Sequence, residues 1–263
     1  MKIAERIYRL SEEALREIEE RLFDIGDFSY AIERTKNGLF LKSYSDAVDG
    51  VLKELGFEAV EEREVDPLEW VKNELKEPFE IAPGVVVDPA GNFEGSGTVL
   101  KIPPGMAFGT GIHPTTKMIA RFMVDHFREG MSFLDVGTGS GILSILAAKM
   151  GASKVVAVDN DPLAVEVARE NAERNRVRVE VLRSDLLSSV SGKFDFVAAN
   201  IVPSILRRLA DQISKVTKNG TLVALSGIDA NGAEDIEKLY KGRGMEVVER
   251  RIEGEWAAIL LRS

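Results

Sequence analysis

Three glycines follow one apolar run of the sequence, and an acidic residue ends the next apolar run. Residues 134–143 read LDVGTGSGIL, in which Gly137, Gly139 and Gly141 separate two apolar stretches. Glycines let the backbone turn sharply and approach a ligand closely, because no Cβ stands in the way. Asp159 lies 22 residues after Gly137, and a carboxylate at a strand end can accept hydrogen bonds from both hydroxyls of a ribose. The pattern indicates a site for a ligand that contains a nucleoside.

The spacing of the glycines separates two classes of cofactor. The nicotinamide dinucleotide fingerprint is G-x-G-x-x-G, whereas residues 137–141 read G-x-G-x-G. Asp135 precedes the turn, where a carboxylate would repel a pyrophosphate but would favour a cationic amino acid group. We therefore expect S-adenosylmethionine, whose amino group and sulfonium are both positive. The expected contacts from this part of the sequence are Asp135, Gly137, Thr138, Gly139, Gly141 and Asp159. A dehydrogenase and a purely structural glycine turn are the alternatives.

Polar residues also end two later apolar runs. Asp185, in Ser184-Asp185-Leu186, can meet the amino group of adenine, and Asn200 ends the run FDFVAAN. The amide oxygen of Asn200 can accept a hydrogen bond from a substrate amine and direct the lone pair of that amine at a methyl group. We therefore expect Asn200 to take part in catalysis and in cofactor binding. The structural alternative for Asn200 is a helix N-cap ahead of Pro203.

These residues need a sheet whose strands end along one edge. From Lys117 onward, apolar strands alternate with helices, the last predicted helices being 202–220 and 233–244, and residues 245–263 read as a closing hairpin. This order predicts an α/β fold, a doubly wound, mostly parallel Rossmann-like sheet with an antiparallel edge. Ligands of such sheets bind outside the carboxyl ends of the strands. We assign 79–263 to this domain. Two strand-like segments, PFEIAPGVVVDP (78–89) and GTVLKIP (97–103), are expected to form an extension leading into it.

The N-terminal part has a different order of elements. Residues 1–65 are predicted as strand, helix, two strands, helix and strand, with Ser11 as N-cap of the first helix and Gly56 as C-cap of the second. The last strand is expected over 57–65. This is the split βαβ order of a small ferredoxin-like α+β domain. Asp66-Pro67 opens a short charged helix that Pro78 ends, so 66–78 is predicted as a stiff linker.

Charge and composition exclude several kinds of function. Residues 1–90 hold 12 Lys and Arg against 22 Asp and Glu, whereas residues 91–263 hold 22 against 21. The acidic N-terminal part would repel nucleic acid and attract a basic protein, unless it is only a solvated surface. The chain has no cysteine and two histidines, so we expect no metal site. No apolar run is long enough for a membrane span and the first residues lack a signal-peptide core, so we expect a cytoplasmic protein.

The motifs together resemble a known enzyme family. DVGTGSG, VDNDP and VAANI resemble the seven-strand S-adenosylmethionine-dependent methyltransferases, and PGMAFGTGIHPTT is similar to the signature of the ribosomal protein L11 methyltransferases. That family has a small N-terminal recognition domain, a linker and a catalytic domain, so the resemblance covers the whole chain. It implies protein N-methylation of ribosomal protein L11 at its N-terminal amine and at lysines. A methyltransferase acting on another protein, a nucleic acid or a small molecule is the alternative.

The same resemblance bears on the strand end at Asn200. Related amine and amide methyltransferases carry Asn-Pro-Pro-Tyr there, whereas this chain reads Asn200-Ile201-Val202-Pro203 and lacks the aromatic residue that stacks on a planar base. This difference argues against methylation of nucleic-acid bases, and we expect no direct binding of nucleic acid.

The stretch 103–116 precedes the first helix of the catalytic domain and can fold over the cofactor site as a lid. Gly105, Gly109 and Gly111 would supply hinge freedom, and Phe108 would cover the methyl group or the adenosine and exclude water. The resemblance implies that Thr116 reaches the amino acid end of the cofactor. His113 is either a contact at the start of the helix or a proton acceptor.

Overall fold

The computed structural model describes residues 3–25, 30–35, 38–65, 77–104 and 110–263. The chain divides into two compact units, Met1–Glu74 and Leu75–Ser263. Most of the predicted linker helix (66–76), and the lid residues Gly105, Phe108 and Gly109, lie outside the described residues. Within those ranges, every helix is too short or too polar to span a lipid bilayer.

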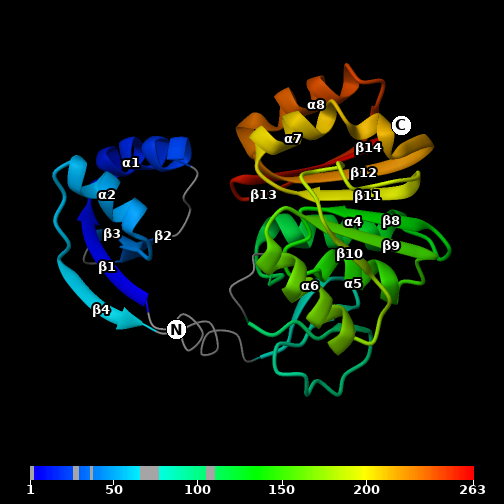
Figure 1. Cartoon of the computed structure of the whole chain (residues 1–263), viewed down its shortest axis with the longest axis horizontal. Helices are drawn as coiled ribbons and strands as arrows, with labels where there is room; N and C mark the ends of the chain where they lie inside the picture. Colours follow the sequence, from blue (N-terminus) through cyan, green and yellow to red (C-terminus); the bar gives the residue numbers. More distant parts are fainter. Residues whose placement is uncertain (1–2, 26–29, 36–37, 66–76, 105–109) are drawn as a thin grey trace. The chain divides into compact units, whose positions relative to one another are not determined.

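The N-terminal unit is a four-stranded sheet with two helices packed against it. Its strands lie in the order β2-β3-β1-β4, and each pairs with its neighbour in antiparallel fashion. The elements are β1 (Ile3–Leu10), α1 (Glu12–Ile25), β2 (Tyr30–Thr35), β3 (Gly38–Ser43), α2 (Asp46–Glu54) and β4 (Glu61–Val65). Figure 1 shows both helices on the same face of the sheet, and their apolar residues form one buried core with its strands. The predicted order of elements is therefore present.

The helix ends of this unit follow local rules, and one strand differs from the prediction. The Oγ atom of Ser11 accepts a hydrogen bond from the backbone N–H of Ala14 at 3.1 Å, which confirms the predicted N-cap of α1. Gly56 follows α2 with φ +81°, as a C-terminal glycine should. β4 begins at Glu61 and not at Phe57, because Phe57 packs against the helical core instead of extending the sheet.

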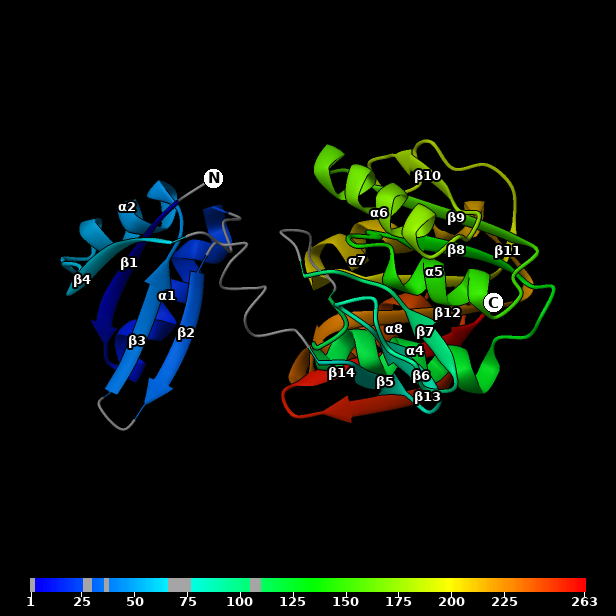
Figure 2. The ribbon, with the colours of Figure 1, turned by 90° about the horizontal axis from the view of Figure 1, so that it is seen from below.

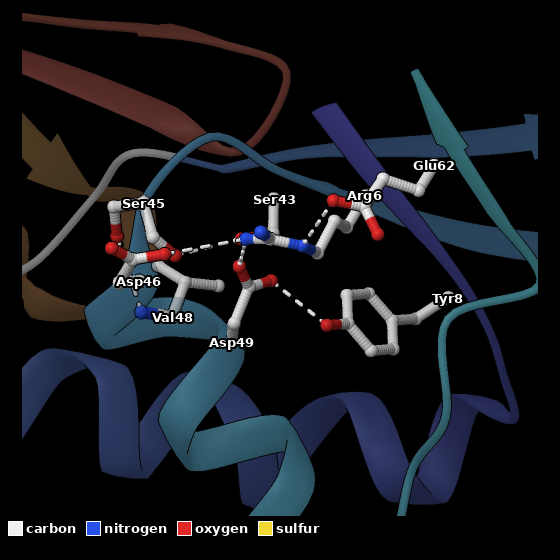
Figure 3. A network of polar contacts seen from close by, with 8 residues as sticks. All are labelled: Arg6, Tyr8, Ser43, Ser45, Asp46, Val48, Asp49 and Glu62. Atoms are coloured by element: carbon white, nitrogen blue, oxygen red, sulfur yellow. Dashed lines mark hydrogen bonds and ion pairs between the residues drawn. The ribbon is translucent and has the colours of Figure 1, made fainter. Parts of the chain in front are cut away.

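A polar network joins β1 to α2 and β4 in this acidic unit (Figure 3). The guanidinium of Arg6 donates hydrogen bonds to Glu62 at 3.1 Å, to Asp46 at 3.3 Å and to Asp49. The hydroxyl of Tyr8 donates to the other oxygen of Asp49 at 2.8 Å. Burial, together with the bond to Asp49, raises the pKa of Tyr8. The side chain of one arginine thus links three carboxylates where the helix packs on the sheet.

The second unit begins with a small three-stranded sheet, in the segments that the sequence predicted as a strand-like extension. Its strands lie in the order β5-β6-β7 and are β5 (Phe79–Ala82), β6 (Val85–Val87) and β7 (Thr98–Leu100). Asn175 ties its end to the rest of the unit: the side-chain amide donates to the carbonyl of Lys101, and the amide oxygen accepts from the N–H of Lys101, both at 2.8 Å. The side chain of Asn175 pairs with the backbone as a neighbouring strand would.

The main sheet has seven strands in the order β10-β9-β8-β11-β12-β14-β13. Neighbours from β10 to β12 are parallel, and the chain ends with β14, which is antiparallel to both of its neighbours, β12 and β13. The strands are β8 (Ser132–Val136), β9 (Lys154–Asp159), β10 (Glu180–Arg183), β11 (Phe194–Asn200), β12 (Thr217–Asp229), β13 (Glu246–Glu253) and β14 (Trp256–Arg262). The predicted mostly parallel sheet with an antiparallel edge is confirmed.

Helices cover both faces of this sheet, as Figure 1 and Figure 2 show. One face packs against α4, α5 and α6, and the other packs against α7 and α8. The helices are α4 (Pro114–His126), α5 (Ile142–Lys149), α6 (Pro162–Arg174), α7 (Pro203–Ala210) and α8 (Ala233–Lys241), with short 3₁₀ turns at η1 (Ile213–Lys215) and η2 (Ala230–Gly232). Strand order reverses between β8 and β11, so the crevice for a ligand lies at the carboxyl ends of these two strands.

One predicted helix is wrong in length. The expected helix 202–220 ends at Ala210, and β12 already begins at Thr217. Ile213 and Val216 are buried in the core below α7, and Thr217 pairs with Phe194 of β11. The apolar residues that suggested further helical turns instead bring the chain back into the sheet.

Candidate functional site

All three glycines of the turn after β8 have positive φ. Gly137, Gly139 and Gly141 have φ values of +75°, +53° and +81°, in the left-handed region that side chains disfavour. A Cβ on Gly137 would lie 2.3 Å from Cγ2 of Ile201, and one on Gly141 would lie 3.2 Å from Cβ of Ala168. The turn thus passes close to β11 on one side and lets α5 pack on α6 on the other.

Asp135 lies beneath this turn. Its side chain is buried, and its Oδ2 accepts hydrogen bonds from the hydroxyls of Thr138 at 2.7 Å and Ser144 at 2.8 Å. Burial raises the pKa of Asp135 to about 6 against the opposing effect of these bonds. Asp135 does not line either of the cavities described below. The structure therefore shows a residue that fixes the turn to α5, and a direct contact between Asp135 and a cationic ligand stays a prediction.

Asp159 connects the turn to the next strand. Its Oδ2 accepts from the N–H of Gly139 at 2.9 Å, and its Oδ1 accepts from the N–H of Asp161 at 3.0 Å. The N–H groups of Gly137 and Thr138 in turn donate to the carbonyl of Val158 at 2.8 and 3.0 Å. Each carboxylate oxygen keeps a further lone pair, so Asp159 can still accept hydrogen bonds from the hydroxyl groups of a ligand.

A cavity of about 230 Å³, named here the Asp159 cavity, opens at these strand ends. It is lined by Val136, Gly137, Val158, Asp159, Asn160, Ser184, Asp185, Leu186, Ile201, Ile205 and Arg208. Two carboxylates face a space with aliphatic walls, which is the combination that a ribose and a flat base require. Sequence reasoning found the two aspartates but missed Ile201, Ile205 and Arg208. Ile201 lies between β11 and α7, and the face that α7 turns to the cavity with Ile205 and Arg208 is set by its packing.

A second, smaller space, named here the Asn200 cavity, lies on the other side of Gly137. Its volume is about 20 Å³, and it is lined by Thr116, Gly137, Thr138, Gly139, Ile142, Leu143 and Asn200. The side-chain amide of Asn200 donates a hydrogen bond to Oγ1 of Thr116 at 3.2 Å. Because the amide nitrogen binds Thr116, which is buried on α4, the orientation of the whole amide group is fixed. The structure thus brings together two residues that lie 84 positions apart.

Asn200 is not the N-cap of a helix, which was the alternative role for it. The N-cap of α7 is Val202, and no side-chain hydrogen bond caps that helix. His113 does have a structural role. It is the N-cap of α4, its Nδ1 lies 2.7 Å from Oγ1 of Thr115, and its ring packs edge-on against Trp256 with the ring centroids 4.7 Å apart. Burial lowers the pKa of His113. The contact at the start of the helix is therefore the role that is observed.

Gly111 is the one predicted hinge glycine within the described residues. Its φ is +95°, and a Cβ there would lie 2.9 Å from Cδ1 of Ile142 and 3.2 Å from Cγ2 of Val87. Gly111 is itself buried. This position therefore packs tightly between α5 and the small sheet, and its glycine is explained by close packing.

Comparisons with known proteins agree with this geometry. The family described as Ribosomal protein L11 methyltransferase (PrmA) matches residues 9–263. The ribosomal protein L11 methyltransferase of Thermosipho melanesiensis is 42% identical over 261 residues, 99% of this chain and 98% of that protein. The one of Thermotoga petrophila is 42% identical over 267 residues, 100% of this chain and 99% of that protein.

Solved structures lead to the same family. The crystal structure of ribosomal protein L11 methylase from Lactobacillus delbrueckii subsp. bulgaricus has a TM-score of 0.66 and 29% sequence identity, and covers 71% of this chain and 99% of that one. The carboxyl ends of the strands thus carry a glycine turn, two carboxylates and a fixed asparagine. The two relatives above match the chain over nearly their full length, and both are ribosomal protein L11 methyltransferases. The chain belongs to the ribosomal protein L11 methyltransferase family.

Proposed function

We propose that this chain transfers methyl groups from S-adenosylmethionine to the N-terminal amine and lysine side chains of ribosomal protein L11. The observation that carries the proposal is the meeting of the Asp159 and Asn200 cavities at Gly137, in a chain of this family. The larger space suits a nucleoside, and the smaller one marks the side of Gly137 on which Asn200 lies. Because this methylation takes place on a ribosomal protein, we also propose that the chain works in the cytoplasm.

The residues present fit S-adenosylmethionine. Gly137 and Ile201 both line the Asp159 cavity, and a Cβ on Gly137 would collide with Ile201 there. Asp159 would accept hydrogen bonds from the ribose hydroxyls, and Asp185 would accept one from the amino group of adenine. Thr116, Thr138, Gly139 and Gly141 would hold the amino acid end through the turn and the start of α4. When bound, the cofactor supplies a methyl group on a positively charged sulfur, which is open to attack by a nucleophile.

Asn200 would orient the substrate amine. Since its amide nitrogen donates to Thr116, its amide oxygen is the atom left to accept an N–H from the substrate. With the cofactor bound, the amine nitrogen would bond to its methyl carbon, the electron pair of the carbon–sulfur bond would leave with sulfur, and the extra proton on nitrogen would pass to water. An amide cannot take up that proton, so Asn200 acts through orientation and not as a base.

The substrate amine must be neutral when it attacks. The reference pKa values are about 8 for an α-amine and about 10.4 for lysine, so about 1 in 2,500 lysine side chains is neutral at pH 7. His113 is used as the N-cap of α4, so the contribution that we assign to the described residues is orientation of the amine by Asn200. We infer that the rate with a lysine substrate rises with pH, because the neutral fraction increases tenfold per pH unit.

We further propose that residues 1–65 form a ferredoxin-like domain that recognises the substrate, that 66–78 is a linker, and that 79–263 is the catalytic domain. The strand order β2-β3-β1-β4 and the division into two compact units support this organisation. The net charge of −10 over residues 1–90 suits a basic ribosomal protein. Phe108 is proposed as the residue that covers the reacting groups.

The proposed function is tested by incubating the chain with purified ribosomal protein L11 and S-adenosylmethionine labelled in the methyl group. Mass spectrometry should find the label on the N-terminal amine and on lysines of L11. A parallel reaction with a lysate of cells that lack this enzyme tests the alternative substrates. Label that appears on another protein, on nucleic acid or on a small molecule, and not on L11, would contradict the proposal.

A further inference from the structure

Arg208, in the last turn of α7, and Asp185, in the loop after β10, meet at the Asp159 cavity, and both line it. Nη2 of Arg208 donates to Oδ1 of Asp185 at 3.1 Å and to Oδ2 at 2.8 Å. Both side chains are about half exposed, at 53% and 56%. An exposed ion pair of this kind adds little to the stability of a fold. Because both residues line the cavity, the pair can instead affect ligand binding.

The loop that carries Asp185 is held in an unfavourable backbone conformation. Leu186 has φ +50°, one of two non-glycine residues with positive φ among the described residues, and it is buried. The hydroxyl of Ser184 donates to the carbonyl of Leu186 at 2.8 Å and accepts from the N–H of Ser189 at 3.0 Å. Backbone strain persists where the surroundings over-determine it, and it is concentrated at ligand sites. The backbone of the loop is thus fixed by the protein, and Arg208 fixes the carboxylate.

We propose that Arg208 is a positioning residue: it holds the carboxylate of Asp185 for the 6-amino group of adenine and so makes the site prefer a 6-aminopurine nucleoside to a 6-oxopurine nucleoside. This inference rests on the proposed function, because it concerns the nucleoside of the proposed cofactor. It assigns Arg208 a role that Asp185 alone cannot fill, since Asp185 is half exposed and would otherwise turn freely in water.

The chemistry of the pair explains the preference. A carboxylate has about four lone-pair positions, and Arg208 uses one on each oxygen, so the remaining positions can accept the N–H bonds of a 6-amino group. A 6-oxo group has no such hydrogen and would place its own oxygen against the carboxylate. Without Arg208, the carboxylate would be hydrated and mobile, and binding would have to order it. The loss should therefore be greater for adenosine derivatives than for inosine derivatives.

The test compares the binding of S-adenosylhomocysteine and S-inosylhomocysteine by calorimetry. Arg208→Met should weaken S-adenosylhomocysteine about tenfold, as expected for the loss of a charge-assisted contact, and should weaken S-inosylhomocysteine less. Arg208→Lys should recover part of the affinity, because a single nitrogen of Arg208 makes both contacts. Arg207→Met is the matched control: Arg207 is the exposed neighbour on the same helix and does not line the cavity, so binding should not change.

A double-variant comparison decides whether Arg208 acts through Asp185. In the Asp185→Asn background, Arg208→Met should cause little further loss, since the partner that it positions is already altered. The inference is wrong if Arg208→Met leaves binding unchanged, if it weakens both nucleosides equally, or if its effect is undiminished in the Asp185→Asn background. Failure of the unmodified chain to bind S-adenosylhomocysteine would instead overturn the proposed function.

Discussion

The two ends of the seven-stranded sheet use their polar side chains in opposite ways, and β11 shows both. At its start, Asp195 accepts from the backbone N–H and the hydroxyl of Ser132 at 2.9 and 2.7 Å, and from Lys218 at 2.6 Å. The bond from Lys218, followed by those from Ser132, lowers the pKa of Asp195 to about 2. At the other end of the strand, Asn200 uses its amide nitrogen on Thr116 and has its oxygen left for a ligand.

The difference separates residues that stabilise the fold from residues that build a site. The amino-end carboxylate meets a cation and two donors from neighbouring strands, and so it contributes to stability. At the carboxyl ends, Asp185 and Asn200 are each held by the side chain of a single residue, and both line a cavity. Substitutions at the carboxyl end of the sheet should therefore change ligand binding and activity. Substitutions at the amino end should change only the free energy of unfolding.

The largest effect is expected for Gly137→Ala, at the carboxyl end of β8. The new Cβ would lie 2.3 Å from Ile201 at a φ of +75°, so the turn must distort, and binding of S-adenosylhomocysteine should fall at least about 100-fold. Gly130→Ala, near the amino end of β8, is the matched control: its φ is +85°, but its Cβ would meet no atom within 4 Å. Gly130→Ala should lower stability and leave calorimetric affinity intact. Equal affinity in both variants would contradict the assignment of the turn.

Asn200→Ala should reduce kcat about 100-fold on ribosomal protein L11, because the amine would no longer be oriented toward the methyl group. Affinity for S-adenosylhomocysteine should change less than about tenfold, since the nucleoside contacts lie in the other cavity. Single-turnover kinetics and calorimetry separate the two quantities. A fall in affinity with an unchanged kcat would make Asn200 a binding residue only.

Thr116→Val should give a smaller loss, about tenfold in kcat, because it removes one hydrogen bond and leaves Asn200 in place but free to rotate. Thr116→Ser keeps the hydroxyl and should recover most of the rate. If Ser and Val at this position behaved alike, the hydroxyl would have no role in orienting Asn200.

The smallest effect is expected at the amino end, from Asp195→Asn. A carboxyl whose pKa is lowered in the folded state contributes stability that is present above its unfolded value of about 4 and is lost as the pH falls toward 2. Since the side chain is 32% exposed, we expect about 1 kcal/mol at pH 7 after screening by solvent. Urea unfolding at pH 7 and at pH 2 should show a difference from the unchanged chain only at pH 7. Any change in kcat would contradict the division between the two ends.

Local signals in the sequence were sufficient for much of the fold and for part of the candidate site. The glycine turn, Asp159 and Asn200 could be predicted because each follows an apolar run, and parallel strands bring such ends to one edge. Asp185 followed from the same reasoning. The order of elements in both units also followed from apolar periodicity and caps.

The rest depended on packing that periodicity does not determine. The sequence could not show that Asp135 points beneath the turn, since both faces of β8 are covered by helices. Arg208 reaches the cavity because of the face that α7 turns toward it, and the packing of the helix sets that face. The pairing of Asn175 with Lys101 joins residues 74 positions apart through a side chain, for which no local pattern exists.

The placement of β14 has a consequence for the order in which the protein is made. β12 pairs with β11 on one side and with β14 on the other. Because a ribosome releases the chain from its amino end, every residue of the candidate site emerges while that second edge of β12 still lacks its partner. An unpaired edge strand is a template for pairing with other chains. A nascent chain halted before Trp256 would therefore carry the whole candidate site together with a surface prone to aggregation, until residues 256–262 cover it.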